Sequence, residues 1–496
     1  MNILRLPRLL AAVACASGVA AWIRFLDSGL VLSHYDAKAH LVVARRVIDS
    51  ITPGWQQVGA VWLPLPHLIQ ILPTQIDLFY RTGAFASLLS IASFTVMVWA
   101  AVRLVIAMTG SATGAITTAA MLVSNPNLLY LQSTPMTEPL LLATLFVVTL
   151  WLYEWVDAAD PRAAPTLAVP AKLGWALAAA AWTRYEAWLV VGAALAATLW
   201  ALWRRGVGMR QAVLAVGSLA AWPAAAVILF VGNSRVSTGA WFVSGGFYEI
   251  DPLYHGRAAK SLIAVWWGTH RLSGYVAEVV ALAGALCLLA IGTSRPRAGA
   301  RVIPLALLAA AALPFYAFFA GHPFRVRYMV VLAAACALFS GLGVGLVRHR
   351  LAATALAAVV VGATLVESPP WTLAAPMIDE ARWDVPRANE RQQVTACLRD
   401  QYGDEKILAS MGSLAHYMQE LSHDGFRISD FIHEGNGDLW TLALATGPAA
   451  HAGWMLIEEQ SEGGDILARR LREDVTFAAG MERACASGGV ALYRRR

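Results

Sequence analysis

The chain alternates between long apolar runs and short polar segments over most of its length. A helix that crosses a bilayer needs about 20 mostly apolar residues, and eleven runs approach or reach that length. These runs are residues 9–26, 82–107, 112–131, 139–156, 171–183, 187–203, 211–231, 273–293, 302–320, 328–347 and 351–366. The pattern therefore predicts an α-helical polytopic membrane protein with about eleven transmembrane helices.

The pattern changes after Glu367, where charged residues become frequent and helical and strand-like segments alternate. Residues 387–401 favour a helix, and residues 406–411, 453–457 and 490–493 favour short strands. Such alternation is typical of a small α/β domain. The aromatic residues of this part are expected in its core rather than as sugar-binding platforms; they are Trp383, Tyr402, Tyr417 and Trp440.

The domain organisation follows from these two patterns. We expect a transmembrane domain over residues 1–366, with a long outer loop over residues 27–80, and an α/β domain over residues 367–496. Pro369, Pro370 and Pro376 indicate a stiff linker between them.

Composition supports the membrane assignment and orients the chain. Hydrophobic residues make up 58% of the sequence and charged residues 14%, whereas about a quarter of a soluble domain is charged. The net charge is +6, but basic residues gather in brief links between spans, at 204–205, 295–301 and 348–350. This is typical of cytoplasmic loops and not of a nucleic-acid-binding surface. We therefore predict a multi-pass protein of the bacterial cytoplasmic membrane, with an uncleaved cytoplasmic N-terminus and an extracytoplasmic C-terminal domain.

Five cysteines are too few for a disulfide scaffold. Cys15, Cys287 and Cys336 fall in apolar runs, whereas Cys397 and Cys485 lie in the polar C-terminal part. The last two are either candidates for one disulfide or a pair of free buried thiols.

The first outer loop contains a group of residues suited to acid–base chemistry. If the segment is helical, Asp36 and His40 lie one turn apart on the same face. The Asp36 carboxylate could accept a proton from an attacking hydroxyl or amine, and His40 could orient it or bind phosphate. The alternatives are an ordinary solvated loop, or a divalent-metal site formed with His34.

Two further segments place charges at the outer ends of spans. Glu138 begins the fourth span and is either a second acid of the site or a helix-terminal charge that favours the helix dipole. The segment Thr183-Arg184-Tyr185-Glu186 lies between two spans and is either a substrate-orienting loop or a structural pair of Arg184 with Glu186.

A basic segment precedes the tenth span. His322, Arg325 and Arg327 are suited to clamping a phosphate, because guanidinium groups bind phosphate in a bidentate manner. The alternative is an interfacial anchor in which the arginines and Tyr328 extend toward the membrane surface.

Taken in this order along the chain, these motifs resemble the GT-C superfamily of membrane glycosyltransferases, especially the bacterial branch related to protein O-mannosyltransferases and lipid A aminoarabinose transferases. The resemblance covers residues 1 to about 366. It implies inverting transfer of a sugar from a polyprenyl-phosphate donor, with Asp36 matching the loop acid that serves as general base. Arg325 and Arg327 match the residues that hold the lipid phosphate. Asp36 is followed by Ala37, where the mannosyltransferase branch usually has Asp-Glu.

The expected function is therefore a hexosyl- or pentosyltransferase that uses a polyprenyl-phosphate sugar and an envelope acceptor, either a lipid, a glycan or a protein, at the outer face of the membrane. No cofactor, metal or nucleic acid is predicted. The alternatives are a transporter or flippase of a lipid-linked or envelope precursor, and a non-catalytic scaffold. Transporters often carry internal repeats and mid-span charges, whereas the charges here gather at span ends.

Overall fold

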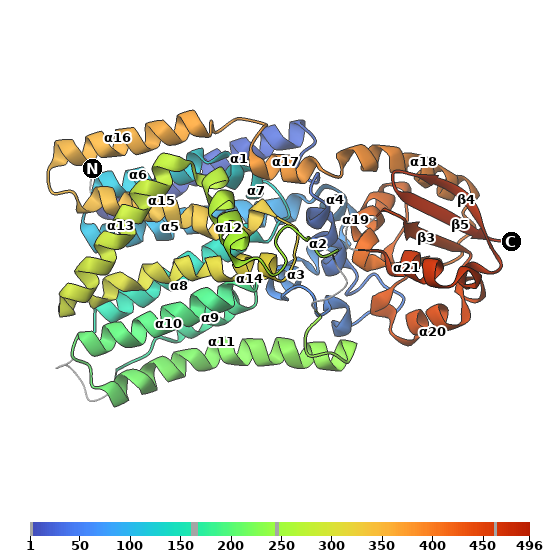
Figure 1. Cartoon of the computed structure of the whole chain (residues 1–496), viewed down its shortest axis with the longest axis horizontal. Coiled ribbons are helices and arrows are strands. Elements are labelled where there is room, and N and C mark those ends of the chain that lie inside the picture. Colours follow the sequence, from blue (N-terminus) through green and yellow to red (C-terminus); the bar gives the residue numbers. More distant parts are fainter. Residues whose placement is uncertain (1–2, 160–166, 244–247, 461–463) are drawn as a thin grey trace.

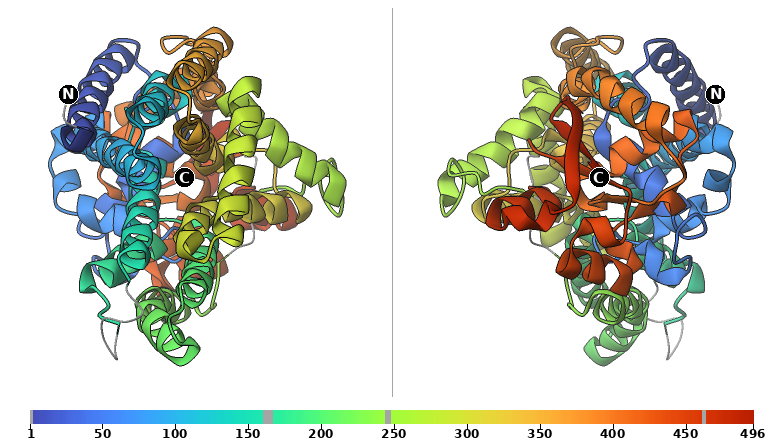
Figure 2. Two further views of the ribbon diagram at one scale, coloured as in Figure 1. Left: turned by 90° about the vertical axis from the view of Figure 1, so that its left-hand side faces the viewer. Right: turned by 90° about the vertical axis from the view of Figure 1, so that its right-hand side faces the viewer.

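The computed structural model describes residues 3–159, 167–243, 248–460 and 464–496. A bundle of long, roughly parallel helices forms one part of the molecule, and a small α/β domain is attached to one end of it (Figure 1). Viewed along the long axis, the helices are seen end-on and the α/β domain covers that end of the bundle (Figure 2). We call this end the site end, because the charged residues singled out in the sequence gather there.

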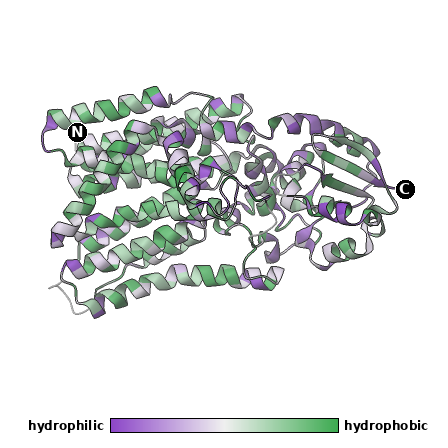
Figure 3. Cartoon of the chain, viewed as in Figure 1, coloured by the Kyte–Doolittle hydropathy of each residue, from purple (hydrophilic) through white to green (hydrophobic). Residues whose placement is uncertain are grey.

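Apolar helices make up the bundle, as predicted. Among the described residues, nine helices are long and apolar enough to cross a bilayer, and the shorter apolar helices α6 and α9 lie in the same bundle. Hydrophobic residues dominate the bundle helices, whereas polar residues are more frequent at the site end and in the α/β domain (Figure 3). The bundle helices are α1 Leu6–Asp27, α5 Ala84–Thr109, α6 Ala112–Ser124, α8 Glu138–Asp157, α9 Ala171–Ala181, α10 Glu186–Arg204, α11 Met209–Thr238, α13 Tyr275–Ser294, η4 Pro296–Ala311 with α14 Ala312–Phe319, η5 Val326–Met329 with α15 Val330–Leu346, and α16 Arg350–Glu367.

Small residues allow close packing within the bundle. A Cβ atom added at Gly114 of α6 would lie 2.4 Å from the carbonyl oxygen of Gly341 in α15. The backbones of α6 and α15 therefore touch at this point, which is the way that small residues let membrane helices approach.

Short helices connect the bundle helices at the site end. They are α2 Tyr35–Arg45, η2 Trp55–Val58, α3 Leu65–Gln70, η3 Pro73–Gln75, α4 Asp77–Thr82, α7 Pro126–Leu131, α12 Ala258–Ser273 and α17 Pro376–Arg382. Helix α12 lies in a segment expected to be an outer loop. It packs small residues such as Gly268 against the bundle and exposes Leu262, Ile263, Trp266 and Trp267.

The C-terminal part contains a five-stranded sheet with the order β2-β1-β3-β5-β4. Strand β1 pairs in parallel with β2 and β3, and β5 pairs antiparallel with β3 and β4. Strands β1 and β3 are buried on both faces, which explains their short and mostly apolar sequences. The elements are α18 Val385–Gln401, β1 Ile407–Ala409, α19 Met411–Leu421, β2 Phe431–Ile432, α20 Asp438–Thr446, β3 Trp454–Glu458, α21 Ile466–Glu473, β4 Met481–Ser487 and β5 Val490–Arg495. The predicted fold class, a polytopic helical membrane protein with a small α/β part, is confirmed.

The aromatic residues of this part are divided between core and surface. Tyr417 and Trp440 are buried, and Tyr402 packs partly buried against the core, as expected. The expectation for Trp383 is wrong, because this side chain is 42% exposed and lines a cavity at the site end.

The α/β domain packs directly on the first outer loop. Lys38 of α2 forms an ion pair of 2.6 Å with Glu420 of α19. The Asp49 carboxylate accepts hydrogen bonds from the backbone N–H groups of Ile428 and Ser429. Helix α2 is thereby enclosed between the bundle and the α/β domain, and ten of its eleven residues are buried.

Candidate functional site

The start of α2 places Asp36 inside the site end. The His34 side chain caps this helix, because its Nδ1 atom accepts the backbone N–H of Asp36 at 3.1 Å. Asp36 is 8% exposed and Tyr35 lies beside it. The helix confirms the predicted placement of Asp36 and His40 one turn apart.

Asp36 forms a short ion pair with Arg327, which lies just before α15. The distance between Asp36 Oδ2 and Arg327 Nη1 is 2.5 Å. Burial by itself raises the pKa of the Asp36 carboxyl, but the Arg327 guanidinium, together with His34 and His40, outweighs burial and lowers the pKa to about 2. Asp36 is therefore an ionised carboxylate at neutral pH.

A second carboxylate, Glu380 of α17, contacts the same arginine. Its Oε2 atom accepts the backbone N–H of Val326 at 2.7 Å. Its Oε1 atom lies 3.6 Å from His34 Nε2 and 3.7 Å from Arg327 Nε. The same His34 Nε2 atom also lies 3.0 Å from Arg327 Nη1, so His34, Arg327 and Glu380 meet at one point. Burial raises the pKa of Glu380, but His34 and Arg327 outweigh burial and the pKa is lowered.

Sequence reasoning missed Glu380. The residue lies in a segment read as linker, and the Pro at the first position of α17 is the only local signal that a helix begins there. Nothing in that signal shows that the helix packs beside residues 34–36.

A second charged group consists of Glu138, Arg184 and Glu186. Arg184 lies 3.1 Å from Glu138 and 2.9 Å from Glu186, and it donates a hydrogen bond to the Thr137 hydroxyl at 3.0 Å. Burial lowers the pKa of Arg184, but the two carboxylates outweigh burial and the pKa is raised. The Arg184–Glu186 pair considered from the sequence is present, and Glu138 joins it. The Glu138 side chain is fully buried. Arg184 Nη1 faces its Oε1 atom, and its Oε2 atom has no hydrogen-bond partner among the described residues.

His40 lies between the two charged groups. His67 donates from Nδ1 to the Leu63 carbonyl at 3.2 Å, so its Nε2 atom accepts the Nδ1–H of His40 at 3.0 Å. The Trp62 ring packs on His40, with centroids 4.1 Å apart. Burial is the main cause that lowers the pKa of His40 well below its usual range and that of His67 to about 3. His40 is thus neutral, and its ring contacts His67 rather than Asp36.

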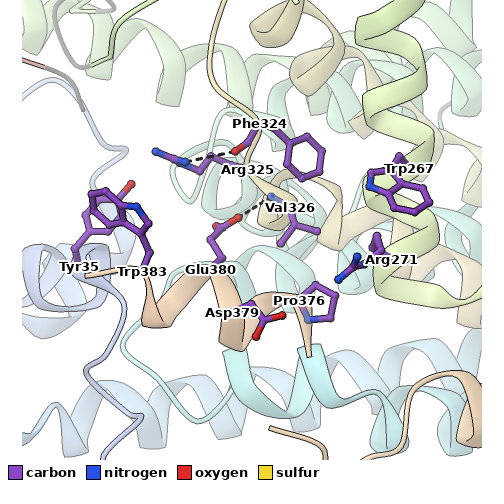
Figure 4. Close-up of a pocket in the computed structure, with 10 residues that line it drawn as sticks. All are labelled: Tyr35, Trp267, Arg271, Phe324, Arg325, Val326, Pro376, Asp379, Glu380 and Trp383. Atoms are coloured by element: carbon purple, nitrogen blue, oxygen red, sulfur yellow. Dashed lines mark hydrogen bonds between the residues drawn. The ribbon is translucent and has the colours of Figure 1, made fainter. Parts of the chain in front are cut away.

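A cavity of about 320 Å³ opens beside the Asp36–Arg327 pair. Arg325, Arg271 and the rings of Tyr35, Trp267 and Trp383 contribute to its wall (Figure 4). The complete set of residues around it is Tyr35, Trp267, Arg271, Phe324, Arg325, Val326, Pro376, Asp379, Glu380 and Trp383. The cavity therefore combines cationic groups suited to phosphate with aromatic faces.

His322 and Tyr185 lie outside this arrangement and have local partners. His322 donates to the Pro323 carbonyl at 2.7 Å and accepts the Tyr328 hydroxyl at 3.1 Å. The Tyr185 hydroxyl donates to the Val61 carbonyl at 2.9 Å.

The metal site considered for His34, Asp36 and His40 is not formed. His34 caps α2, Asp36 pairs with Arg327, and His40 contacts His67. In the described part of the chain, no group of three His, Cys, Asp or Glu side chains is arranged to hold a metal ion.

An apolar helical bundle with a charged site at one end, covered by a small α/β domain, defines a polytopic helical membrane fold. Two crystal structures of ArnT from Cupriavidus metallidurans, one bound to undecaprenyl phosphate and one in the apo state, are similar to this chain. Each ArnT structure is 13% identical in sequence to this chain and superposes with a TM-score of 0.58. The match covers 98% of this chain and 97% of the ArnT chain. No protein-family model and no curated protein sequence matches the chain. The resemblance drawn from the motifs is thus confirmed for the fold.

Proposed function

We propose that the protein is a membrane glycosyltransferase that moves a sugar from a polyprenyl-phosphate donor to an envelope acceptor at the outer face of the bacterial cytoplasmic membrane. The observation that carries the proposal is the buried Asp36–Arg327 pair beside a cavity walled by arginines and aromatic rings. The fold supports it, because a protein of the same fold has been crystallised with undecaprenyl phosphate.

The donor headgroup occupies the cavity in this proposal. Arg325 and Arg271 contact the phosphate, and the aromatic walls of Trp267 and Trp383 contact the sugar and the first part of the lipid. As the bond between the anomeric carbon and the phosphate oxygen breaks, negative charge grows on the leaving phosphate. Fixed guanidinium groups that face this charge stabilise the transition state.

Asp36 acts as the general base, but its ion pair must first loosen. A carboxylate with a pKa of about 2 is a weak base at neutral pH. The donor phosphate competes for the Arg327 guanidinium, and loss of that contact raises the pKa of Asp36. The acceptor oxygen then attacks the anomeric carbon, its proton passes to Asp36, and polyprenyl phosphate leaves.

Glu138 provides the second carboxylate, on the far side of His40. Arg184 Nη1 lies 3.1 Å from Glu138 Oε1, whereas Glu138 Oε2 has no hydrogen-bond partner among the described residues. Glu138 Oε2 can therefore accept a hydrogen bond from an acceptor hydroxyl. Arg184, itself paired with Glu186, holds Glu138 in place. Tyr185 and His322 support the two loops around the site.

The test is sugar transfer by the purified full-length protein in liposomes, with radiolabelled polyprenyl-phosphate sugars and envelope fractions as acceptors. We expect transfer by the native chain and a loss of at least about 100-fold in Asp36→Asn, since general bases contribute about 10²–10⁴-fold. The matched control is Asp400→Asn, which changes an exposed carboxylate of α18. Equal transfer by Asp36→Asn would keep the enzyme and remove Asp36 from the mechanism. Movement of labelled lipid across the vesicle without any covalent product would favour the transporter.

A further inference from the structure

Two cysteines of the α/β domain lie against each other. Cys397 belongs to α18 and Cys485 to β4, and the two elements pack together. Their thiols are in hydrogen-bond contact, and both side chains lie partly buried against the same apolar cluster. The other three cysteines, Cys15, Cys287 and Cys336, belong to bundle helices.

An irregularity in β4 creates this contact. Met481 and Cys485 are four positions apart, so an unbroken strand would point both to the same face of the sheet. The pairing with β5 shifts between Arg483 and Cys485. As a result, Met481 packs in the cluster on one face of the sheet, and Cys485 packs in the cluster beneath α18 on the other. A bulge that re-aims one side chain is a specific local feature of a strand, and here it directs the Cys485 thiol toward Cys397.

We propose that Cys397 and Cys485 form a disulfide in the mature protein. The two thiols lose two protons and two electrons, and one S–S bond forms. The electrons pass to the disulfide of an oxidised thiol–disulfide oxidoreductase, which is reduced to two thiols. The proposal rests on the extracytoplasmic position of the α/β domain, because disulfides persist in oxidising compartments.

The bond would tie the edge of the sheet to the helix that supports the site. It would close a loop of about 90 residues that contains the strands β1 to β3, and cross-links over long loops restrict the unfolded chain most. Helix α18 also provides Arg391, which is fully buried and hydrogen-bonded to Asp384 and Glu420. Glu420 in turn pairs with Lys38 of α2. The disulfide would therefore hold the framework on which α2 rests.

The folded environment also lowers the reactivity of the Cys485 thiol. Burial, together with the neighbouring Cys397 thiol, raises the pKa of Cys485 to about 12. The thiolate is the reactive form, so it is scarce once the domain has closed. We expect oxidation during export, before folding is complete, and slow re-oxidation of a folded chain that has been reduced.

Thiol trapping tests the proposal. The full-length chain with Cys15, Cys287 and Cys336 each replaced by Ser is produced in a bacterium with periplasmic thiol oxidation, quenched in acid, denatured and alkylated. We expect no alkylated thiol without reductant, two with reductant, and a linked pair of tryptic peptides in the non-reduced sample. Cys397→Ser in the same background is the control, and it should show one free thiol without reductant. Two free thiols in the parent chain before reduction would overturn the proposal.

Thermal unfolding tests the structural role separately. Reductant should lower the Tm of the native chain by roughly 5–10 °C. The double variant Cys397→Ser/Cys485→Ser should have the lower Tm and no response to reductant. A native Tm that is the same with and without reductant would overturn the stabilising role of the bond.

Discussion

At the scale of single residues, the site is organised around Arg327. This guanidinium contacts Asp36 at 2.5 Å and lies 3.7 Å from Glu380, so a buried and a partly buried carboxylate share one cation. A buried charge pair contributes little net stability, but removal of one partner leaves the other unpaired and costs about 3–5 kcal/mol. Arg327 therefore maintains the site in two ways. It neutralises the charge of the two carboxylates, and it lowers the pKa of Asp36.

The first prediction concerns acid stability. The pKa of Asp36 is about 2 in the folded chain and about 3.9 in an unfolded one. A lowered folded pKa stabilises the protein above the unfolded pKa, and this contribution is lost as pH falls from about 4 to about 2. The size of the effect is about 2 kcal/mol. Thermal unfolding at pH 5 and at pH 2.5 should show a smaller acid-induced fall of Tm in Asp36→Asn than in the native chain.

The second prediction concerns Glu380. In Glu380→Gln the amide oxygen can still accept the Val326 N–H, but the negative charge that faces His34 and Arg327 is lost. Glu380 lines the cavity, so this change removes a negative charge that repels the donor phosphate and that competes with it for Arg327. We expect a decrease of roughly 10-fold in KM for the donor, about 1.4 kcal/mol, with a smaller change in kcat. Glu390→Gln, which changes an exposed residue of α18, is the control, and an unchanged KM in Glu380→Gln would exclude this role.

The sequence predicted part of the charged site. Asp36, Arg327 and the Arg184–Glu186 pair were found because each lies at the end of an apolar run, where charge is unusual. Glu380 was not found, because its contacts with His34 and Arg327 depend on tertiary packing of α17. Local periodicity contains no information about that packing.

At the scale of elements, bilayer thickness made the bundle predictable. A span must be apolar over a length that the membrane fixes, so each of the eleven runs corresponds to a helix of the bundle. Helix α12 was missed because it is short, with exposed apolar residues on one side and His270 and Arg271 in its last turn. Strands β1, β3 and β5 were found because each contains a short apolar stretch, as buried strands do.

The third prediction concerns the contact of α6 with α15. Gly114→Ala should force these helices apart, because the added Cβ would lie 2.4 Å from the Gly341 carbonyl oxygen. We expect a loss of about 1–3 kcal/mol, as for other overpacked cores, measured as a lower Tm in detergent. Gly192→Ala in α10 is the matched control, since its Cβ would meet no atom within 4 Å. Equal Tm values for the two variants would contradict the close packing.

At the scale of the whole molecule, the two ends of the bundle differ in character. The links that follow α10, α13 and α15 lie at the end opposite to the α/β domain, and they carry the clusters of basic residues (Figure 1). The positive-inside rule predicts that the end with these clusters faces the cytoplasm, and this orientation stays a prediction.

The fourth prediction tests this orientation. In a chain whose native cysteines are replaced by Ser, Asp438→Cys lies in the α/β domain and Arg297→Cys lies in the first turn of η4, just after α13. A membrane-impermeant maleimide applied to cells with a permeabilised outer membrane should label the first and not the second. Both should be labelled after the inner membrane is opened, and the reverse pattern in intact cells would invert the topology.

The position of the cavity also affects how the reaction should be measured. Trp267 forms part of the cavity wall and belongs to α12, whose outward side chains are apolar. A donor that reaches the cavity past this helix arrives by lateral diffusion within one leaflet. Its effective concentration is then a surface mole fraction. Added inert phospholipid should therefore slow the reaction even when the bulk concentration of the donor is kept constant. Added buffer leaves the mole fraction of the donor in the membrane unchanged, so it should not slow the reaction.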